Sequence, residues 1–370
     1  MLLAWPPGGQ RLAGILSIGE LPGHRKQIAP AADRGEACRV LYSDRRLNMK
    51  KTTRLFATLL SAGALLATDA ALAQGYPEKA VTIVVPYAAG GGADILARLL
   101  SQKLGPIWGQ PVVVENRPGA GGSVGSAHAS RAAPDGYTLL MASPSHTINA
   151  SLYKSLPFDA VKDFDPAVLV ASGPLALVVP AQGSIQTLDD FVKQVKEPGA
   201  INFASAGVGS SPHLAGELFN QMAHAKMTHI PYKGTAPALT DLLADRVQVM
   251  FAPVPTVMPH LKSGALKVLA VTSLEPFAAL PGVPALAQRF PGYEVLQWWG
   301  LVAPAGTPPA VLGKLNTDVA TVLRSPDVQE RLAALGAVAG GQPASQFGDL
   351  IKGEIPKWAE VIKAANVQPE

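Results

Sequence analysis

From Val81 onward, short apolar runs alternate with amphipathic segments of helical period, and this alternation limits the possible folds more than any other feature. The run Val81–Pro86 (VTIVVP) is typical of a buried strand. A predicted helix, Ala93–Leu104, follows it, with Gly105 as the expected stop. Strands that alternate with helices form largely parallel sheets covered by helices on both faces. The sequence therefore predicts an α/β fold.

The same pattern continues almost to the end of the chain. Helix starts are marked by a predicted capping box at Thr187 and Asp190, and by Ser325 before a proline at a first helical position. Further strands are predicted at Val112–Glu115, Tyr137–Ala142, Leu175–Val179, Ile201–Ala204, Val247–Phe251, Lys267–Val271 and Gly300–Ala303.

Residues 49–73 have the three parts of a secretory signal peptide. A basic head is followed by an apolar stretch, Leu55–Ala67, and by a small-residue cleavage site that ends at Ala73. The apolar stretch is too short to span a bilayer comfortably. We predict cleavage after Ala73 and a mature chain in the periplasm. Residues 1–48 show no sustained period, and we interpret them as a non-native extension before a true start at Met49.

Removal of this segment changes the charge balance. The chain has 31 Lys and Arg against 27 Asp and Glu, a net charge of +4. Residues 1–73 hold 10 of the basic and 5 of the acidic residues, which leaves 21 against 22, a net charge of −1. The mature chain therefore has no basic excess that would favour nucleic acid. The only cysteine, Cys38, is lost too, so the mature chain has no disulfide, thiol nucleophile or thiolate metal site. We expect neither a metal nor a cofactor.

A triple glycine, Gly90, Gly91 and Gly92, lies between the first strand and the first helix. Glycine allows close backbone approach, and the free N–H groups of a helix start attract an anion. One alternative is a dinucleotide site, since the next strand ends at the acidic Glu115, but G-x-G-x-x-G spacing is missing. Another is a plain tight turn. The reading as a carboxylate site is favoured.

The segment NRPGAGGSVGS contains a G-x-S-x-G match at Gly121–Gly125, with Ser123 at its centre. A hydrolase serine must lie on a sharp elbow between strand and helix. Here a loop, Arg117–Gly121, separates the strand from the serine, which argues against such an elbow. An exported serine hydrolase nevertheless stays as the alternative function.

A third glycine-bearing loop follows the strand that ends at Ala204. It leads through Gly207 and Gly209 to Ser210 and Ser211, directly before a proline that opens a helix. The two serines are predicted either to bind a ligand with their hydroxyls or only to cap the helix. His213, in the first turn, faces the ligand or packs the turn; the sequence leaves both open. The one cation beside a further loop, Lys233, is interpreted as a solvated surface residue.

Six segments, in this order, resemble the substrate-binding receptors of tripartite tricarboxylate transporters, also called Bug receptors. The resemblance covers the chain from about Tyr76 to its end and departs at Ala88-Ala89, where many members have proline. It implies a two-lobed periplasmic binding protein, type II-like, with a mostly parallel sheet in each lobe and two hinge crossings near Leu175–Pro180 and Trp298–Pro304. Lobe 1 would comprise residues 76–175 and 299–370, and lobe 2 residues 176–298. The segments are VVPYAAGGGADILARLL, ENRPGAGGSVGS, PDGYTLLMAS, INFASAGVGSSPHLAGE, HIPYKG and WWGLVAPAGTP.

The family also implies a ligand site between the lobes, in which backbone amides, hydroxyls and water hold a carboxylate. Carried over by position, the expected ligand-binding residues are Tyr87, Ala88, Gly90, Gly91, Gly92, Asp94, Ser143, Thr147, Asn149, Ser205, Gly207, Gly209, Ser210, Ser211 and His213.

The resemblance implies a function as well. We expect a monomeric periplasmic solute-binding receptor, not an enzyme, that captures a small organic carboxylate or a related amino or aromatic acid. The ligand would be delivered to integral-membrane permease subunits. A ligand sensor for a membrane signalling partner is a further alternative.

Overall fold

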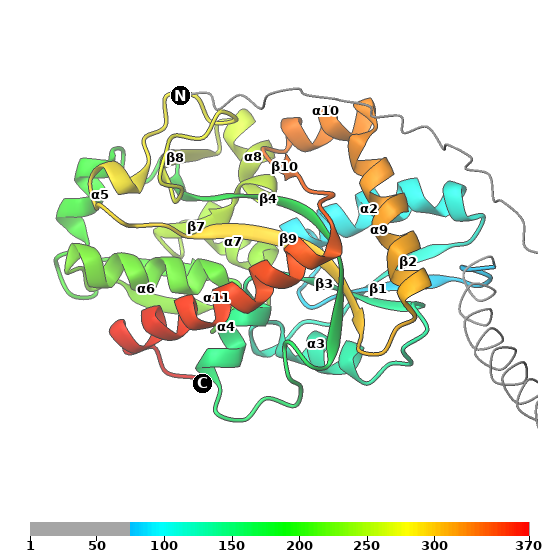
Figure 1. The fold of residues 1–370 in the computed structure, drawn as a ribbon. Coiled ribbons are helices and arrows are strands. Elements are labelled where there is room, and N and C mark those ends of the chain that lie inside the picture. Colours follow the sequence, from blue (N-terminus) through cyan, green and yellow to red (C-terminus); the bar gives the residue numbers. More distant parts are fainter. Residues whose placement is uncertain (1–74, 370) are drawn as a thin grey trace, which may run out of the picture. The chain divides into compact units, whose positions relative to one another are not determined.

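The computed structural model describes residues 75–369 (Figure 1). The predicted extension, residues 1–48, and the predicted signal peptide, residues 49–73, lie outside the described residues. No helix within residues 75–369 is long and apolar enough to cross a membrane.

One sheet is built from strands of both the first and the last part of the described chain. Strand β1 lies between β2 and β3 and is parallel to both, whereas β9 is antiparallel to β3 and β4. A short strand, β10, pairs with β4. The strands are β1 (Val81–Val85), β2 (Val112–Asn116), β3 (Thr138–Ala142), β4 (Phe164–Pro180), β9 (Leu296–Pro304) and β10 (Val338–Ala339).

A second sheet is built on the continuation of β4. Past its pairing with β9, β4 pairs antiparallel with β7 and β8, and β5 lies parallel to β6 and β7. The added strands are β5 (Asn202–Ser205), β6 (Thr228–Pro231), β7 (Val249–Pro253) and β8 (Leu266–Val271).

Helices accompany both sheets, and we use them to name two lobes. Lobe 1 consists of β1–β3 and β10 with helices α2 (Gly92–Trp108), α3 (Ser123–Ser130), α4 (Ser145–Leu152), α9 (Pro309–Arg324), α10 (Pro326–Ala334) and the 3₁₀ turn η1 (Ala120–Gly122). Lobe 2 consists of β5–β8 with α5 (Leu188–Gln194), α6 (Ser211–Ala223), α7 (Thr235–Leu243), α8 (Val254–Lys262) and the 3₁₀ turn η2 (Leu286–Gln288). Strands β4 and β9 and the last helix, α11 (Ala344–Ala364), contact both.

Helix α2 shows how apolar spacing fixes an element. Leu96, Leu100 and Leu104 are fully buried against the lobe 1 sheet, and each contributes about 1.5–3 kcal/mol through burial. The predicted stop at Gly105 is wrong, because the helix continues to Trp108 and ends with Gly109 in the left-handed conformation, at φ 62°. Burial of the Trp108 ring in the lobe 1 core accounts for the extra turn. This packing fixes the start of α2, where the triple glycine lies.

Helix α11 crosses from one lobe to the other (Figure 1). Its first half packs Phe347 against Trp298 of β9, and its second half packs Trp358 into the core of lobe 2. Between them, the buried carboxylate of Glu354 accepts hydrogen bonds from Trp298 Nε1 (2.8 Å) and Thr147 Oγ1 (3.0 Å). The division proposed from the sequence places residues 299–370 in lobe 1, but the second half of α11 belongs to the lobe 2 core.

Candidate functional site

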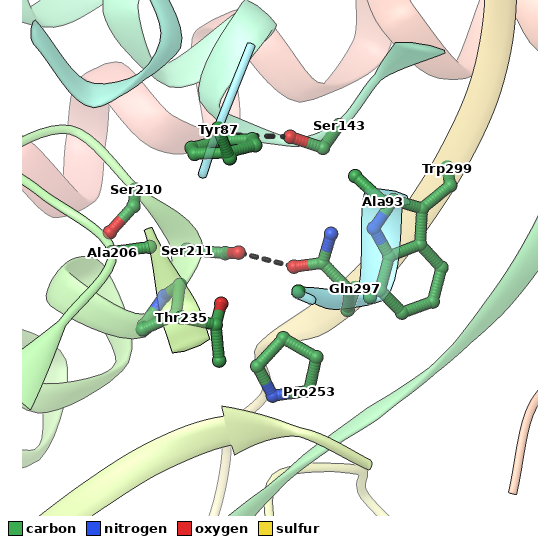
Figure 2. A pocket seen from close by; sticks show the side chains of 13 residues that line it. Tyr87, Ala93, Ser143, Ala206, Ser210, Ser211, Thr235, Pro253, Gln297 and Trp299 are labelled. Atoms are coloured by element: carbon green, nitrogen blue, oxygen red, sulfur yellow. Dashed lines mark hydrogen bonds between the residues drawn. The ribbon is translucent and has the colours of Figure 1, made fainter. Parts of the chain in front are cut away.

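A cavity opens between the lobes, where several helices begin (Figure 2). About 350 Å³ of its space is free of atoms, and part of that is open to solvent. None of its lining residues is charged. The lining residues are Tyr87, Gly91, Gly92, Ala93, Ser143, Ala206, Ser210, Ser211, Pro212, Thr235, Pro253, Gln297 and Trp299.

The first wall of the cavity is the turn between β1 and α2. Gly91 is the N-cap of α2, so the free N–H groups of the first turn begin here. Gly90 has φ +86°, and a Cβ on Gly92 would lie 2.7 Å from the ring of Trp299. These positions need glycine for conformation and for space. Gly91 and Gly92 line the cavity, whereas Ala88 and Gly90 do not.

Asp94, a predicted ligand residue, points away from the cavity lining. Its carboxylate accepts hydrogen bonds from the Gly90 amide (2.9 Å), Arg98 Nε (2.8 Å) and Asn116 Nδ2 (3.0 Å). Burial acts to raise the pKa of Asp94, but the hydrogen bonds from Arg98, Gly90 and Asn116 bring the pKa below its ordinary value. Asp94 therefore stabilises the turn as a carboxylate.

Hydroxyl groups form a second wall. Tyr87 Oη lies 3.2 Å from Ser143 Oγ and also contacts Ser145 Oγ, and the two serine hydroxyls are 3.0 Å apart. Burial raises the pKa of Tyr87, so its hydroxyl stays protonated at neutral pH. Figure 2 shows Tyr87 and Ser143 joined at the edge of the cavity.

The two other predicted residues of this region, Thr147 and Asn149, do not line the cavity. The Thr147 hydroxyl oxygen lies 2.7 Å from the Pro144 carbonyl oxygen and 3.0 Å from Glu354 Oε2, so its one hydrogen is shared between them. Asn149 Nδ2 donates to Ser123 Oγ (3.1 Å) and to the Gly121 carbonyl (3.3 Å). Both residues support α4 and its neighbours.

The start of α6 forms the third wall of the cavity, and its two adjacent serines have different hydrogen-bond partners. Ser210 Oγ donates to the Gly207 carbonyl (2.6 Å) and makes no capping bond, although Ser210 is the N-cap. Ser211 Oγ instead donates to Gln297 Oε1 across the cavity (Figure 2). Gly207 and Gly209 have φ +120° and +77°, and neither lines the cavity.

His213 packs behind this loop and is not among the lining residues. Its Nδ1 accepts the Gly209 N–H (3.3 Å), and its ring stacks on His229 at 4.0 Å between centroids. His229 Nε2 in turn lies 2.6 Å from the hydroxyl of Ser205, another predicted ligand residue, which also does not line the cavity. Burial lowers the pKa of His213 to about 4, and burial together with the neighbouring His213 lowers that of His229 to about 3. Of the two readings left open for His213, the structure supports packing of the turn.

The turns of the two lobes touch beside the cavity. The Ala88 amide donates to the Lys233 carbonyl (3.1 Å), while the Lys233 side chain is exposed. A Cβ on Gly121 would lie 1.9 Å from the Val208 carbonyl oxygen, and one on Gly209 would lie 2.0 Å from Asn149 Oδ1. The lobes are therefore closed around the cavity, and glycines allow the contact.

Ser123, on which a hydrolase would depend, is the first residue of α3 and does not line the cavity. Its hydroxyl accepts a hydrogen bond from Asn149, and within residues 75–369 no histidine bonds to it. The arrangement differs from a serine–histidine pair.

Sequence reasoning missed seven lining residues, of which Thr235, Gln297 and Trp299 are the most informative. Gln297 is a polar residue within the apolar strand β9, and that contrast is a signal that could have identified it. Thr235 follows a glycine at a helix start, the same signal that identified the other two loops. The full set is Ala93, Ala206, Pro212, Thr235, Pro253, Gln297 and Trp299.

Comparisons with known proteins identify the family and the fold. Residues 96–367 match the family described as the tripartite tricarboxylate transporter family receptor. The protein BugT of Bordetella pertussis is 37% identical over 295 residues, which cover 79% of this chain and 90% of BugT. A structure of a Rhodopseudomonas palustris protein with adipate has a TM-score of 0.77 and 33% identity, and covers 80% of this chain and 100% of that one. MatC from Rhodopseudomonas palustris with bound malate has a TM-score of 0.74 and 33% identity, over 78% of this chain and 100% of MatC.

Proposed function

This chain belongs to the tripartite tricarboxylate transporter receptor family, and on that premise we propose that it captures a small organic carboxylate between its lobes and delivers it to a membrane permease. Membership confirms the predicted Bug-type family, the predicted α/β periplasmic binding fold, and the prediction of a receptor and not an enzyme. The ligand class, the delivery step and the monomeric state are the proposed parts.

One observation carries the ligand class: the cavity is lined by helix starts and hydroxyl groups but by no charged side chain. The starts of α2 and α6 come from opposite lobes, and both contribute residues to the lining. Free N–H groups and the helix dipole favour an anion at such a point. A carboxylate has about four lone-pair sites and a negative charge for these N–H and O–H donors, whereas a neutral amide or an alcohol has about two sites and no charge.

Two similar proteins support the same class. One structure contains adipate and another contains malate, and both ligands are short organic acids. Each of these proteins is 33% identical to this chain. We therefore propose a carboxylate as the ligand of this chain but do not assign adipate or malate.

Delivery to a permease is supported by the family and by the contacts between the lobes. The hydrogen bond from the Ala88 amide to the Lys233 carbonyl joins turns of opposite lobes in this closed arrangement. Closure around a ligand gives a membrane partner a surface that signals a filled site.

The test of ligand class begins with mass spectrometry of small molecules released from freshly purified protein. Thermal shift and calorimetry then compare dicarboxylates and monocarboxylates of four to six carbons with the corresponding amides. We expect acids alone to stabilise the protein, by about 2.7 kcal/mol at a hundred times Kd. Equal stabilisation by amides, or none by any acid, would refute the proposed ligand class.

Delivery is tested by uptake. Cells that lack this chain should fail to take up the identified acid, and restoring the chain should restore uptake. Normal uptake without the chain would contradict the permease role while leaving the ligand class intact.

A further inference from the structure

The peptide unit between Val208 and Gly209 lies at the contact between the lobes. Its carbonyl oxygen faces lobe 1, where a Cβ on Gly121 would lie only 1.9 Å from it. Its N–H donates to Nδ1 of His213, in the first turn of α6, at 3.3 Å. A trans peptide unit is planar, and its C=O and N–H point in opposite directions. The hydrogen bond to His213 therefore fixes the orientation of the carbonyl group that meets lobe 1.

The same loop also forms a wall of the cavity. Ala206 and Ser210, at its two ends, both line the cavity. Between them, Gly207 and Gly209 have φ +120° and +77°. Glycine can adopt many conformations, so bonds from outside the loop are needed to hold one of them. The bond from Gly209 to His213 is such a bond.

His213 can hold the loop only as a neutral ring. Its Nδ1 accepts the Gly209 N–H, so the hydrogen bond assigns the one imidazole hydrogen to Nε2. A second proton would bind to Nδ1 and place two N–H groups against each other. Because the Gly209 N–H would then have no acceptor, the peptide unit would have to rotate.

The groups around His213 oppose this second proton in the closed arrangement. The ring is buried and stacks on His229 of β6 at 4.0 Å between centroids, so a charge on one ring disfavours a charge on the other. From α6, the carboxyl Oε1 of Glu217 lies 3.9 Å from His213 Nε2, and burial raises the pKa of Glu217. Strand β5 contributes the ring of Phe203 and the hydroxyl of Ser205, and neither is charged. Burial lowers the pKa of His213 to about 4, from an ordinary value of 6.5.

We propose that His213 is a positioning residue for closure of the lobes, and that binding of one proton to its Nδ1 opens the lobes and releases the ligand. The inference rests on the proposed function, because it concerns the affinity for the same acid. The neutral ring holds the peptide unit of Val208 and Gly209 in the orientation that lobe 1 accepts. The protonated ring repels the Gly209 N–H, and the carbonyl then turns against Gly121. Since the closed form excludes the proton, affinity is complete above pH 6.5 and falls as the pH drops towards 4.

The variant His213→Asn tests the inference, since the asparagine Oδ1 can replace Nδ1 as the acceptor but does not titrate. Calorimetry would measure Kd for malate and adipate at pH 7.5 and at pH 5.5. Protonation of the acids themselves is the same for both proteins, so the quantity compared is the wild-type Kd divided by the variant Kd. This ratio should rise about tenfold between pH 7.5 and pH 5.5. That is the factor for a histidine that titrates at 6.5 in the open form and at about 4 in the closed form.

His224→Asn, the same substitution at an exposed position, is the matched control and should follow the wild type at both pH values. His213→Phe, which can neither accept a hydrogen bond nor titrate, should bind weakly at both. A ratio of wild-type to His213→Asn Kd that is the same at pH 7.5 and at pH 5.5 would overturn the role of His213.

NMR of the histidine rings in the wild type makes the same test if the asparagine variant fails to fold. Malate should lower the pKa of His213 and leave that of His224 unchanged. The same pKa of His213 with and without bound malate would contradict the inference. Wild-type protein that binds no acid of the thermal-shift series would instead refute the proposed function, and the inference with it.

Discussion

Two adjacent serines at the start of α6 have different partners. Both serines line the cavity, but Ser210 donates within its own loop to the Gly207 carbonyl, whereas Ser211 donates to Gln297 of β9. The sequence places both serines at the helix start but does not determine the direction of either side chain. That direction depends on β9, which lies some 90 residues further along the chain and is not visible in local spacing.

Ser211→Ala should therefore weaken ligand binding by about tenfold, because Gln297 Oε1 loses its buried donor and the Gln297 amide group is no longer held at the cavity. Calorimetry with the identified acid measures the loss. Ser263→Ala, at an exposed position, is the control. Unchanged affinity of the Ser211 variant would show that the Ser211–Gln297 hydrogen bond does not contribute to ligand binding.

The buried histidines make stability depend on pH. The pKa values of His146 and His213 are about 4 and that of His229 is about 3, each below the ordinary value of 6.5. The unfolded chain then binds protons that the folded chain does not, so stability is complete above pH 6.5 and falls as the pH drops towards 4. Each histidine contributes up to about 1.4 kcal/mol per pH unit.

Urea unfolding at pH 7.5 and at pH 5 should show this decrease. His229→Phe should flatten the slope, since the ring stack remains while the titrating group is removed. His224→Asn, at an exposed position, should keep the slope. Equal unfolding free energies at both pH values in the wild type would contradict the expectation.

The predicted site residues divide into those that line the cavity and those that lie behind its loops, for backbone and side-chain roles alike. Gly91 and Gly92 line the cavity, as their spacing before a helix suggests. Asp94 and His213 were proposed from their nearness to the loops, but their side chains bond to partners behind the loops. Whether any of these residues contacts ligand stays a prediction.

At the scale of elements, local chemistry predicted helix starts better than strand lengths. The capping box at Thr187 and Asp190 is confirmed by both of its hydrogen bonds. The strand expected at Leu175–Val179 is instead part of β4, Phe164–Pro180. Its first half contains Pro166, a residue that usually ends strands, and register shifts beside it accommodate the proline.

Helix α11 joins the two lobes through its second half. Trp358 is fully buried in the lobe 2 core, and its removal leaves a large cavity there. Trp358→Ala should lower the free energy of unfolding by about 3–5 kcal/mol. Glu360→Ala, two positions away on the exposed face, should change it by less than about 0.5 kcal/mol. Urea denaturation measures both, and a tryptophan variant as stable as its control would show that α11 does not hold lobe 2.

At the scale of the whole described chain, the two lobes are closed on each other. The family resemblance predicted a cleft between the lobes but did not predict which residues are in contact across it. Gly121 of η1 meets Val208 of the opposite lobe so closely that a Cβ would lie 1.9 Å from the carbonyl oxygen. The G-x-S-x-G match left a hydrolase open as an alternative function, whereas in the structure Gly121 lies at the contact between the lobes. Pairing between distant segments of this kind cannot be predicted from one sequence.

Gly121→Ala should hinder closure and raise Kd for the identified acid at least tenfold. Gly109→Ala is a matched control, because both glycines have positive φ (+56° and +62°) but a Cβ on Gly109 meets nothing within 4 Å. Both variants should lose about 1–2 kcal/mol of stability from backbone strain. Calorimetry and thermal unfolding separate the two effects, and equal Kd values would show that closure tolerates the extra methyl group.

The uncharged lining of the cavity has a consequence for how fast the chain meets its ligand. The electrostatic attraction of a helix N-terminus for an anion falls off within about one turn. The mature chain has a predicted net charge of −1 and therefore does not attract anions over long distances. Encounter is then left to random diffusion. At 0.1 M sodium chloride the Debye length is about 10 Å, and salt therefore slows ligand association with proteins that attract an anion through arginine side chains. The association rate of this protein should stay almost unchanged between low and high salt.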